Sequence, residues 1–255
     1  MKKLFLLLFL LAACDLQEYP EAEQTNRSEI LIYSGMTMIE PLMEIVALIE
    51  AQENCQIKIT YGGSGHILKS VEVNQIGDIF FPGDESYINP LRESGVMTES
   101  VPVGYNQIGF FVQPGNPKQI SADLDHLLDK TLNIVIGSAE AGAVGRETKR
   151  ILNQAGIYQD VVDNALYMTT DSKGLAAAIK SKTVDLTVNW KSVGFLTRNV
   201  GGMDFIPLPT EYSQKHPLVM GLLSYSQHPE LAKKFLQLAS SDAGRGIFRK
   251  YGFLD

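Results

Sequence analysis

Short apolar segments alternate with amphipathic ones along most of this 255-residue chain. Apolar runs of this length are typical of buried β-strands, and the stretches between them carry apolar residues at helical spacing. Expected strands are 30–33, 57–61, 79–81, 108–112, 132–136, a short one near Tyr167, and 186–190; expected helices are 39–53, 122–128, 146–155 and 174–182. This alternation predicts an α/β fold with mainly parallel sheets.

Four of the expected strand-to-helix junctions combine small residues with glycines or hydroxyl side chains. They are 34–37 (SGMT), 62–65 (GGSG), 142–145 (GAVG) and 169–172 (TTDS). In parallel sheets ligands bind at the carboxyl ends of strands, where the following helices present unpaired amides and the positive end of the helix dipole. One such hydroxyl is usually an ordinary helix cap. Four junctions together predict an anion-binding site.

The first residues have the composition of an export signal. Two lysines precede an apolar run over 4–13 that is too short to span a bilayer. The end of this run, LAAC at 11–14, resembles the lipobox of bacterial lipoproteins, which implies cleavage before Cys14 and attachment of a lipid to it. The alternative is an ordinary cleaved signal with an incidental cysteine. Residues 14–28 are polar and lack periodicity, as expected of a flexible tether.

The charge balance excludes two classes of partner. Loss of the signal segment with its two lysines changes the formal net charge from −7 to −9. An acidic chain argues against binding to nucleic acid or to an anionic membrane surface, because both require clustered Lys and Arg. An anion receptor with this balance needs short-range hydrogen-bond donors.

The only other cysteine, Cys55, has no partner for a disulfide if Cys14 is lipidated. We expect Cys55 to be a small buried side chain at the start of a strand. Stability then depends on the hydrophobic core, which a chain of this length can form without disulfides.

From residue 30 to 253 the chain resembles the molybdate-binding ModA proteins, a family of periplasmic solute-binding proteins. The resemblance is diffuse and is best over 33–45, 61–71, 144–155, 171–179 and 247–253. It implies a type II periplasmic-binding-protein-like fold, with two α/β lobes joined by a two-crossing hinge. The implied lobes are residues 29–105 plus 208–255 and residues 106–207.

The same resemblance implies a function without covalent chemistry or a cofactor. The expected protein is a monomeric, lipid-anchored receptor on the outer side of the cell membrane, which faces the periplasm if the cell is Gram-negative. It captures a tetrahedral oxyanion, molybdate or tungstate, and delivers it to an ABC permease and its ATPase. A receptor for phosphate, sulfate or a metal ion is the alternative.

Carried over residue by residue, the resemblance implies an oxyanion site made of neutral donors. The hydroxyls of Thr37 and Ser64 belong to one lobe. The backbone amides of Val144 and Ser172 belong to the other, with Ala143 as the alternative to Val144. A ligand held this way bridges the cleft between the lobes and favours their closure.

Two positions leave the anion preference open. The tyrosine whose hydroxyl completes the anion site in the ModA family falls on Trp190. The indole N–H can donate a hydrogen bond as the tyrosine hydroxyl does, but it extends a different distance from the backbone. Asn189, next to it, is the alternative donor. Arg146 is expected to face solvent or to pair with Glu147 or Glu140, and direct contact with the ligand would favour a phosphate-like anion.

The sequence supports a hydrolase less well than a binding protein. The segment 62–66 (GGSGH) departs from the G-x-S-x-G nucleophile elbow in its last residue. His126, His216 and His228 are scattered, and we expect them at the surface.

Metal ligation and nucleotide binding have no clear motif. No pair of His or Cys residues has the spacing typical of metal ligands. Neither the Walker A motif nor the G-x-G-x-x-G motif, both of which bind nucleotide phosphates, is present. The loop 83–85 (GDE) is expected to be solvated, and Asp78 to cap a helix or form a turn.

Overall fold

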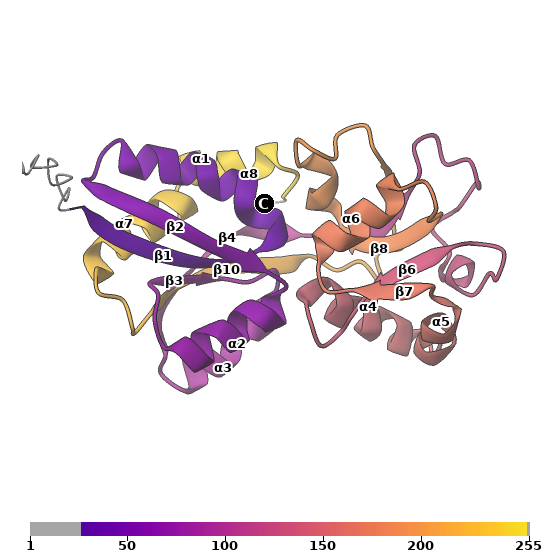
Figure 1. The fold of residues 1–255 in the computed structure, drawn as a ribbon, viewed down its shortest axis with the longest axis horizontal. Coiled ribbons are helices and arrows are strands. Elements are labelled where there is room, and N and C mark those ends of the chain that lie inside the picture. Colours follow the sequence, from indigo (N-terminus) through magenta and orange to yellow (C-terminus); the bar gives the residue numbers. More distant parts are fainter. Residues whose placement is uncertain (1–26, 254–255) are drawn as a thin grey trace, which may run out of the picture.

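The computed structural model describes residues 27–253 and contains two five-stranded sheets that lie side by side (Figure 1). The expected signal segment and Cys14 lie outside the described residues. Within the described part, no helix has the length and apolar composition needed to cross a membrane.

The first sheet has the strand order β2-β1-β3-β10-β4, and we call it with its helices the first lobe. Helices α1, α7 and α8 cover one face, and α2 and α3 cover the other (Figure 1). The elements are β1 (Ser28–Gly35), η1 (Met36–Met38), α1 (Ile39–Glu50), β2 (Cys55–Gly62), α2 (Ser64–Asn74), β3 (Ile79–Phe81), η2 (Glu85–Tyr87), α3 (Asn89–Glu93), β4 (Met97–Asn106), β10 (His216–Leu223), α7 (Pro229–Ser240) and α8 (Asp242–Lys250).

The second sheet has the order β7-β6-β8-β5-β9, and we call it with its helices the second lobe. Helix α6 lies on one side of it, and α4 and α5 lie on the other (Figure 1). The elements are β5 (Ile108–Val112), η3 (Leu124–Leu127), β6 (Ile134–Gly137), α4 (Ala143–Gln154), α5 (Tyr158–Asn164), β7 (Tyr167–Thr169), α6 (Ser172–Lys180), β8 (Leu186–Trp190), η4 (Lys191–Phe195) and β9 (Asp204–Pro207).

The period-two alternation of the strands divides the core of the first lobe into two layers. Ile79 and Phe81 pack with α1, α7 and α8, whereas Phe80 between them packs with α2 and η2. Phe110 and Phe111 are fully buried in the second lobe. The expectation that Cys55 is buried is confirmed.

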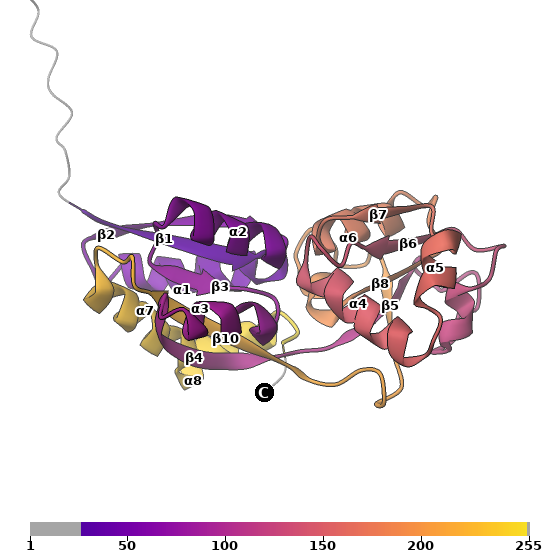
Figure 2. The ribbon, with the colours of Figure 1, turned by 90° about the horizontal axis from the view of Figure 1, so that it is seen from below.

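The sheets are mixed, which corrects the prediction of mainly parallel sheets. Strands β1, β2 and β3 are parallel, as are β6, β7 and β8, but β10 and β5 run antiparallel to their neighbours. The chain leaves the first lobe through β4 and returns through β10 (Figure 2). Neighbouring strands that lead out of a lobe and back into it must run in opposite directions.

Most expected elements are present, with shifted ends. Strands 79–81, 108–112 and 186–190 have the predicted bounds. The predicted helix 122–128 is wrong, because only a short 3-10 helix forms there after a cap by Asp123. Helices α4 and α6 begin earlier than predicted, at Ala143 and Ser172.

Asp78 connects three segments of the first lobe and is neither a helix cap nor a surface turn residue. It is 5% exposed, and its carboxylate accepts hydrogen bonds from the Leu31 amide, at 2.8 Å, and from the Ser226 hydroxyl. Its own amide donates to the Leu31 carbonyl. This buried carboxylate therefore fixes β1 against the loop after β10.

We expect Asp78→Ala to lower the free energy of unfolding by about 1–3 kcal/mol, because it leaves the Leu31 amide without an acceptor. Denaturant unfolding measures the loss. Asp129→Ala is the control, since that carboxylate accepts only from Thr131 within its own turn. Equal effects of the two substitutions would contradict the assigned role of Asp78.

Candidate functional site

A small cavity lies between the two lobes, where the starts of four helical segments meet. Its volume is about 20 Å³, slightly more than the roughly 10–15 Å³ that one water requires. The space suits a ligand of a few heavy atoms. The lining residues are Gly35, Met36, Thr37, Gly62, Gly63, Ser64, Gly83, Gly142, Ala143, Val144, Asp171, Ser172 and Trp190.

The helices that start at this cavity begin with amides that no side chain caps. Gly35, Gly63 and Gly142 are the residues before η1, α2 and α4, and none of them provides a side-chain hydrogen bond. Asp171 caps α6, but it accepts from the Gly174 amide and so leaves the first amides of that helix unused. The cavity is therefore surrounded by backbone donors and by the positive ends of helix dipoles.

Two hydroxyl groups from the first lobe add donors to the same wall. Thr37 and Ser64 are each 3% exposed. The Ser64 Oγ accepts from the Gly83 amide at 2.9 Å, so its hydrogen is free to donate. The Thr37 Oγ1 lies 3.1 Å from the Met38 sulfur, which is a weak acceptor and leaves the hydroxyl available to a better one.

Trp190 supplies the wall of the second lobe, and Asn189 lies behind it. A Cβ placed on Gly83 would be 3.8 Å from Trp190 Nε1 and 3.4 Å from Ser64 Oγ, so the indole nitrogen and the hydroxyl both lie close to Gly83. The Asn189 side chain donates to the Ser172 carbonyl at 3.1 Å and accepts from the Trp190 amide at 2.9 Å. Asn189 positions two lining residues and does not line the cavity.

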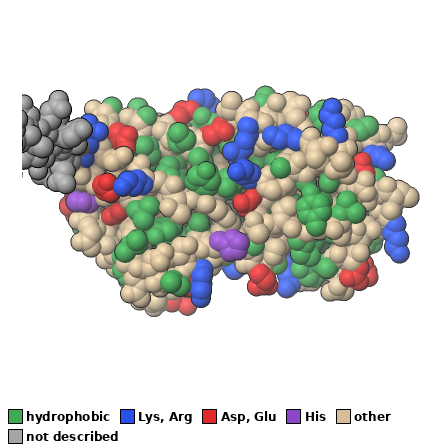
Figure 3. Space-filling view, in the orientation of Figure 1, with side chains coloured by type: hydrophobic (Ala, Val, Ile, Leu, Met, Phe, Trp, Pro, Cys, Tyr) green, Lys and Arg blue, Asp and Glu red, His purple; other side chains and the backbone are tan. Residues whose placement is uncertain are grey.

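Arg146 does not line the cavity either. Its guanidinium carbon lies 3.7 Å from the centre of the Tyr87 ring, and it donates to the Ser86 hydroxyl at 3.1 Å. Arg146 is exposed, so the expectation that it faces solvent is confirmed, whereas its contacts are with Tyr87 and Ser86 and not with Glu147 or Glu140. Among residues 27–253, no cationic side chain lines the cavity. On the face in Figure 3, acidic and basic side chains are interspersed over both lobes.

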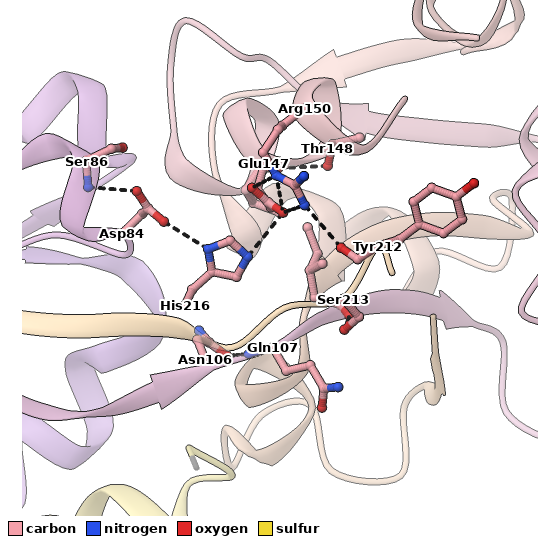
Figure 4. A network of polar contacts seen from close by, with 12 residues as sticks. Asp84, Ser86, Asn106, Gln107, Glu147, Thr148, Arg150, Tyr212, Ser213 and His216 are labelled. Carbon is pink, nitrogen blue, oxygen red and sulfur yellow. Dashed lines mark hydrogen bonds and ion pairs between the residues drawn. The ribbon is translucent and has the colours of Figure 1, made fainter. Parts of the chain in front are cut away.

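His216 is part of a buried polar network at the hinge, so its expected surface position is wrong. Its side chain is 12% exposed, with Nδ1 3.1 Å from Asp84 Oδ2 and Nε2 3.1 Å from Glu147 Oε1 (Figure 4). Arg150 forms a bidentate pair with Glu147 on its other side. The loop 83–85 is accordingly not a solvated loop, since Gly83 lines the cavity and Asp84 joins this network.

The ionisation of this network follows from its geometry. Burial opposes protonation of His216, but the carboxylates of Asp84 and Glu147 outweigh it and raise the pKa of the imidazole to about 9. Burial also acts to raise the pKa of Asp84, yet the hydrogen bonds from His216 and Ser86 lower it overall. His216 is therefore a cation at neutral pH.

The lobes are in a closed arrangement, which glycines make possible. A Cβ on Gly63 would lie 2.4 Å from the Ala141 carbonyl oxygen and 2.6 Å from that of Thr170, both in the second lobe. Glu40 of α1 also reaches across, and its carboxylate accepts from the amide and the hydroxyl of Thr197 at 2.9 Å each. The two lobes thus contact each other through backbone as well as side chains.

No group of three or more His, Cys, Asp or Glu side chains within residues 27–253 is arranged to hold a metal ion. The two ring nitrogens of His216 face carboxylates on opposite sides of the ring. The residues around the cavity instead offer hydroxyl, indole and backbone amide donors, which have the opposite character to the ligands of a cation.

Residues 30–254 match the family model described as bacterial extracellular solute-binding protein. The chain belongs to this family. It is a family of binding proteins, and the two-lobed fold with a cavity between the lobes agrees with that membership.

Known proteins are similar to this solute-binding protein at low sequence identity. A putative binding protein of Haemophilus influenzae is 24% identical over 234 residues, which cover 89% of this chain and 91% of the relative. The periplasmic molybdate-binding protein of Azotobacter vinelandii superposes with a TM-score of 0.76 at 12% identity, covering 89% and 99% of the two chains. The sulfate-binding protein SubI of Mycobacterium tuberculosis gives a TM-score of 0.76 at 16% identity, covering 89% and 86%.

We expect Gly63→Ala to block closure of this solute-binding protein without unfolding it. The backbone at Gly63 has φ −63° and ψ 140°, which alanine adopts freely, so the clash arises only with the opposite lobe. Small-angle scattering should show a larger radius of gyration for the variant, with an unchanged melting temperature.

Gly62→Ala is the matched control, because its Cβ would meet only Ile67 Cγ2, at 3.6 Å. An expansion shared by both variants would mean that the contact across the lobes at Gly63 does not limit closure.

Proposed function

We propose that this protein captures a small tetrahedral oxyanion, molybdate or tungstate, between its lobes and presents it to an ABC permease. The observation that carries the proposal is the convergence of uncapped helix starts and two buried hydroxyls on a cavity without a cationic side chain. The donors implied by the resemblance, from Thr37, Ser64, Val144, Ser172 and Trp190, all belong to residues of this wall. Ala143 lines it as well.

Neutral donors are sufficient to hold a dianion. Hydrogen bonds to a charged acceptor contribute about 1.5–3 kcal/mol each. About six of them supply the roughly −8 to −12 kcal/mol of micromolar to nanomolar binding after closure and dehydration are subtracted. No buried countercharge is required.

The donor-rich wall also favours an anion that carries no proton. Asp171 is the one carboxylate on the wall, and it already accepts from Gly174. A hydrogen phosphate ion would place its own O–H against a surface of mostly donors, which leaves that hydrogen poorly paired. We therefore expect molybdate, tungstate and sulfate to bind more tightly than phosphate, and sulfate is the alternative ligand.

Closure follows from the distribution of these donors. Thr37 and Ser64 are on the first lobe, whereas Val144, Ser172 and Trp190 are on the second, so the anion contacts both only when the lobes meet. We propose residues 29–105 plus 208–255 and residues 106–207 as the two moving units. Their crossings lie at the end of β4 and after β9.

Export and anchoring complete the proposal. The apolar run before Cys14 and the polar stretch after it support a lipid-anchored protein outside the cytoplasm. A tethered, acidic receptor stays near its permease and has no basic surface for nucleic acid. The chemistry of transport belongs to the partner ATPase.

Calorimetric titration with molybdate, tungstate, sulfate and phosphate tests the proposed ligand. We expect Thr37→Ala and Ser64→Ala each to weaken binding of the preferred anion by about 1–3 kcal/mol, because each removes one donor to a charged acceptor. Trp190→Phe should weaken it similarly, since phenylalanine keeps an apolar ring without the N–H.

Ser70→Ala is the control for these variants, because its exposed hydroxyl donates only to the His66 carbonyl within α2. Tight binding that persists in all three wall variants would show that the anion is held elsewhere. No heat with any of the four anions would overturn the oxyanion proposal.

A further inference from the structure

His216 is a residue of the hinge whose side chain reaches both lobes. It is the first residue of β10, directly after the second crossing. Asp84 approaches one ring nitrogen from the first lobe, and Glu147 approaches the other from α4 of the second lobe (Figure 4). Opening of the lobes separates Glu147 from Asp84, so the imidazole cannot keep both contacts.

The charges around His216 balance only when the ring is protonated. The charged groups that face it are Asp84, from the loop after β3, and Glu147, with Arg150 paired to it from the same helix. Glu147 is 6% exposed, so its charge depends on these partners. Two carboxylates and one guanidinium leave one negative charge, which the imidazolium neutralises.

The same ring touches the wall of the binding cavity. The centres of the His216 and Trp190 rings are 5.1 Å apart at an edge-on angle of 64°. Trp190 is fully buried, and its Nε1 lies close to Gly83 of the first lobe. The position of His216 therefore affects both lobe closure and the orientation of one anion donor.

We propose that protonated His216 is an ionic latch that joins Asp84 to Glu147 across the closed lobes. Loss of its proton at alkaline pH releases the latch and so weakens anion binding. The inference rests on the proposed function, because it assumes that the closed form holds the anion. His216 is a positioning residue in this account and does not touch the ligand.

The direction of the pH effect follows from linkage between protonation and closure. In the closed form the pKa of His216 is raised to about 9, and in the open form the loss of Glu147 brings it closer to the ordinary value of about 6.5. The latch is then fully present below the open-form pKa and is lost as pH rises through about 9.

Binding is measured by calorimetry from pH 7 to pH 10, with sulfate or molybdate, whose own charge is constant over this range. We expect the affinity of the unaltered protein to fall about tenfold or more, since each pKa unit between open and closed forms corresponds to a factor of ten. His216→Gln should bind about tenfold more weakly at pH 7 and show no further decline.

Glu40→Gln is the matched control, because it weakens a different contact between the lobes, that with Thr197. We expect it to lower affinity by the same factor at every pH. A decline with pH in His216→Gln that equals that of the unaltered protein would overturn the latch.

Titration of the histidine ring signals by NMR separates the latch from the ligand. The chain has four histidines, and the spectrum of His216→Gln assigns the signal. Glu147→Gln should lower the pKa of His216, whether or not an oxyanion binds. If no anion binds but this pKa falls, the proposed function fails and the latch stands; an unchanged pKa overturns the latch.

Discussion

Unpaired amides at the starts of η1, α2, α4 and α6 are the constraint on which the rest of this structure depends. Such groups must be satisfied by water or by a ligand. Strands of both lobes end at the cleft and so bring four helix starts to one cavity. Glycines before three of these helices leave the amides accessible, and Gly63 lets the lobes approach to backbone contact. Glycines at the helix starts thus account both for the closure of the lobes and for the exposure of the amide donors.

Apart from the Asp171 carboxylate on its wall, the charged side chains near the cavity lie beside it and do not line it. Asp84, His216, Glu147 and Arg150 form a network at the hinge in which each charge has an opposite neighbour. Such a network adds little net field to the cavity, which is left to neutral donors. In this arrangement neutral donors hold the anion through directional hydrogen bonds, and the charged network at the hinge acts on the closure of the lobes.

The parts of the site that depend on local sequence were predictable, and those that depend on contacts distant in sequence were not. Glycine and hydroxyl residues after a strand indicate a helix start wherever they occur, so the residues around Thr37, Ser64 and Val144 were found. Asp84 and His216 are 132 positions apart, and no spacing rule connects them. Arg146 likewise has its partner Ser86 on the other lobe, 60 positions away. The choice between Trp190 and Asn189 was open in the sequence, because alternation along β8 places adjacent residues on opposite sides but does not say which side faces the cleft; Trp190 is the one that lines the cavity.

A crystal structure of the protein grown with tungstate tests the central claim most directly, because tungsten gives a strong anomalous signal. We expect a single strong peak between the lobes, within hydrogen-bond reach of the Thr37 and Ser64 hydroxyls and the amides of Val144 and Ser172. A strong peak outside this cavity, with the cavity filled only by water, would contradict it.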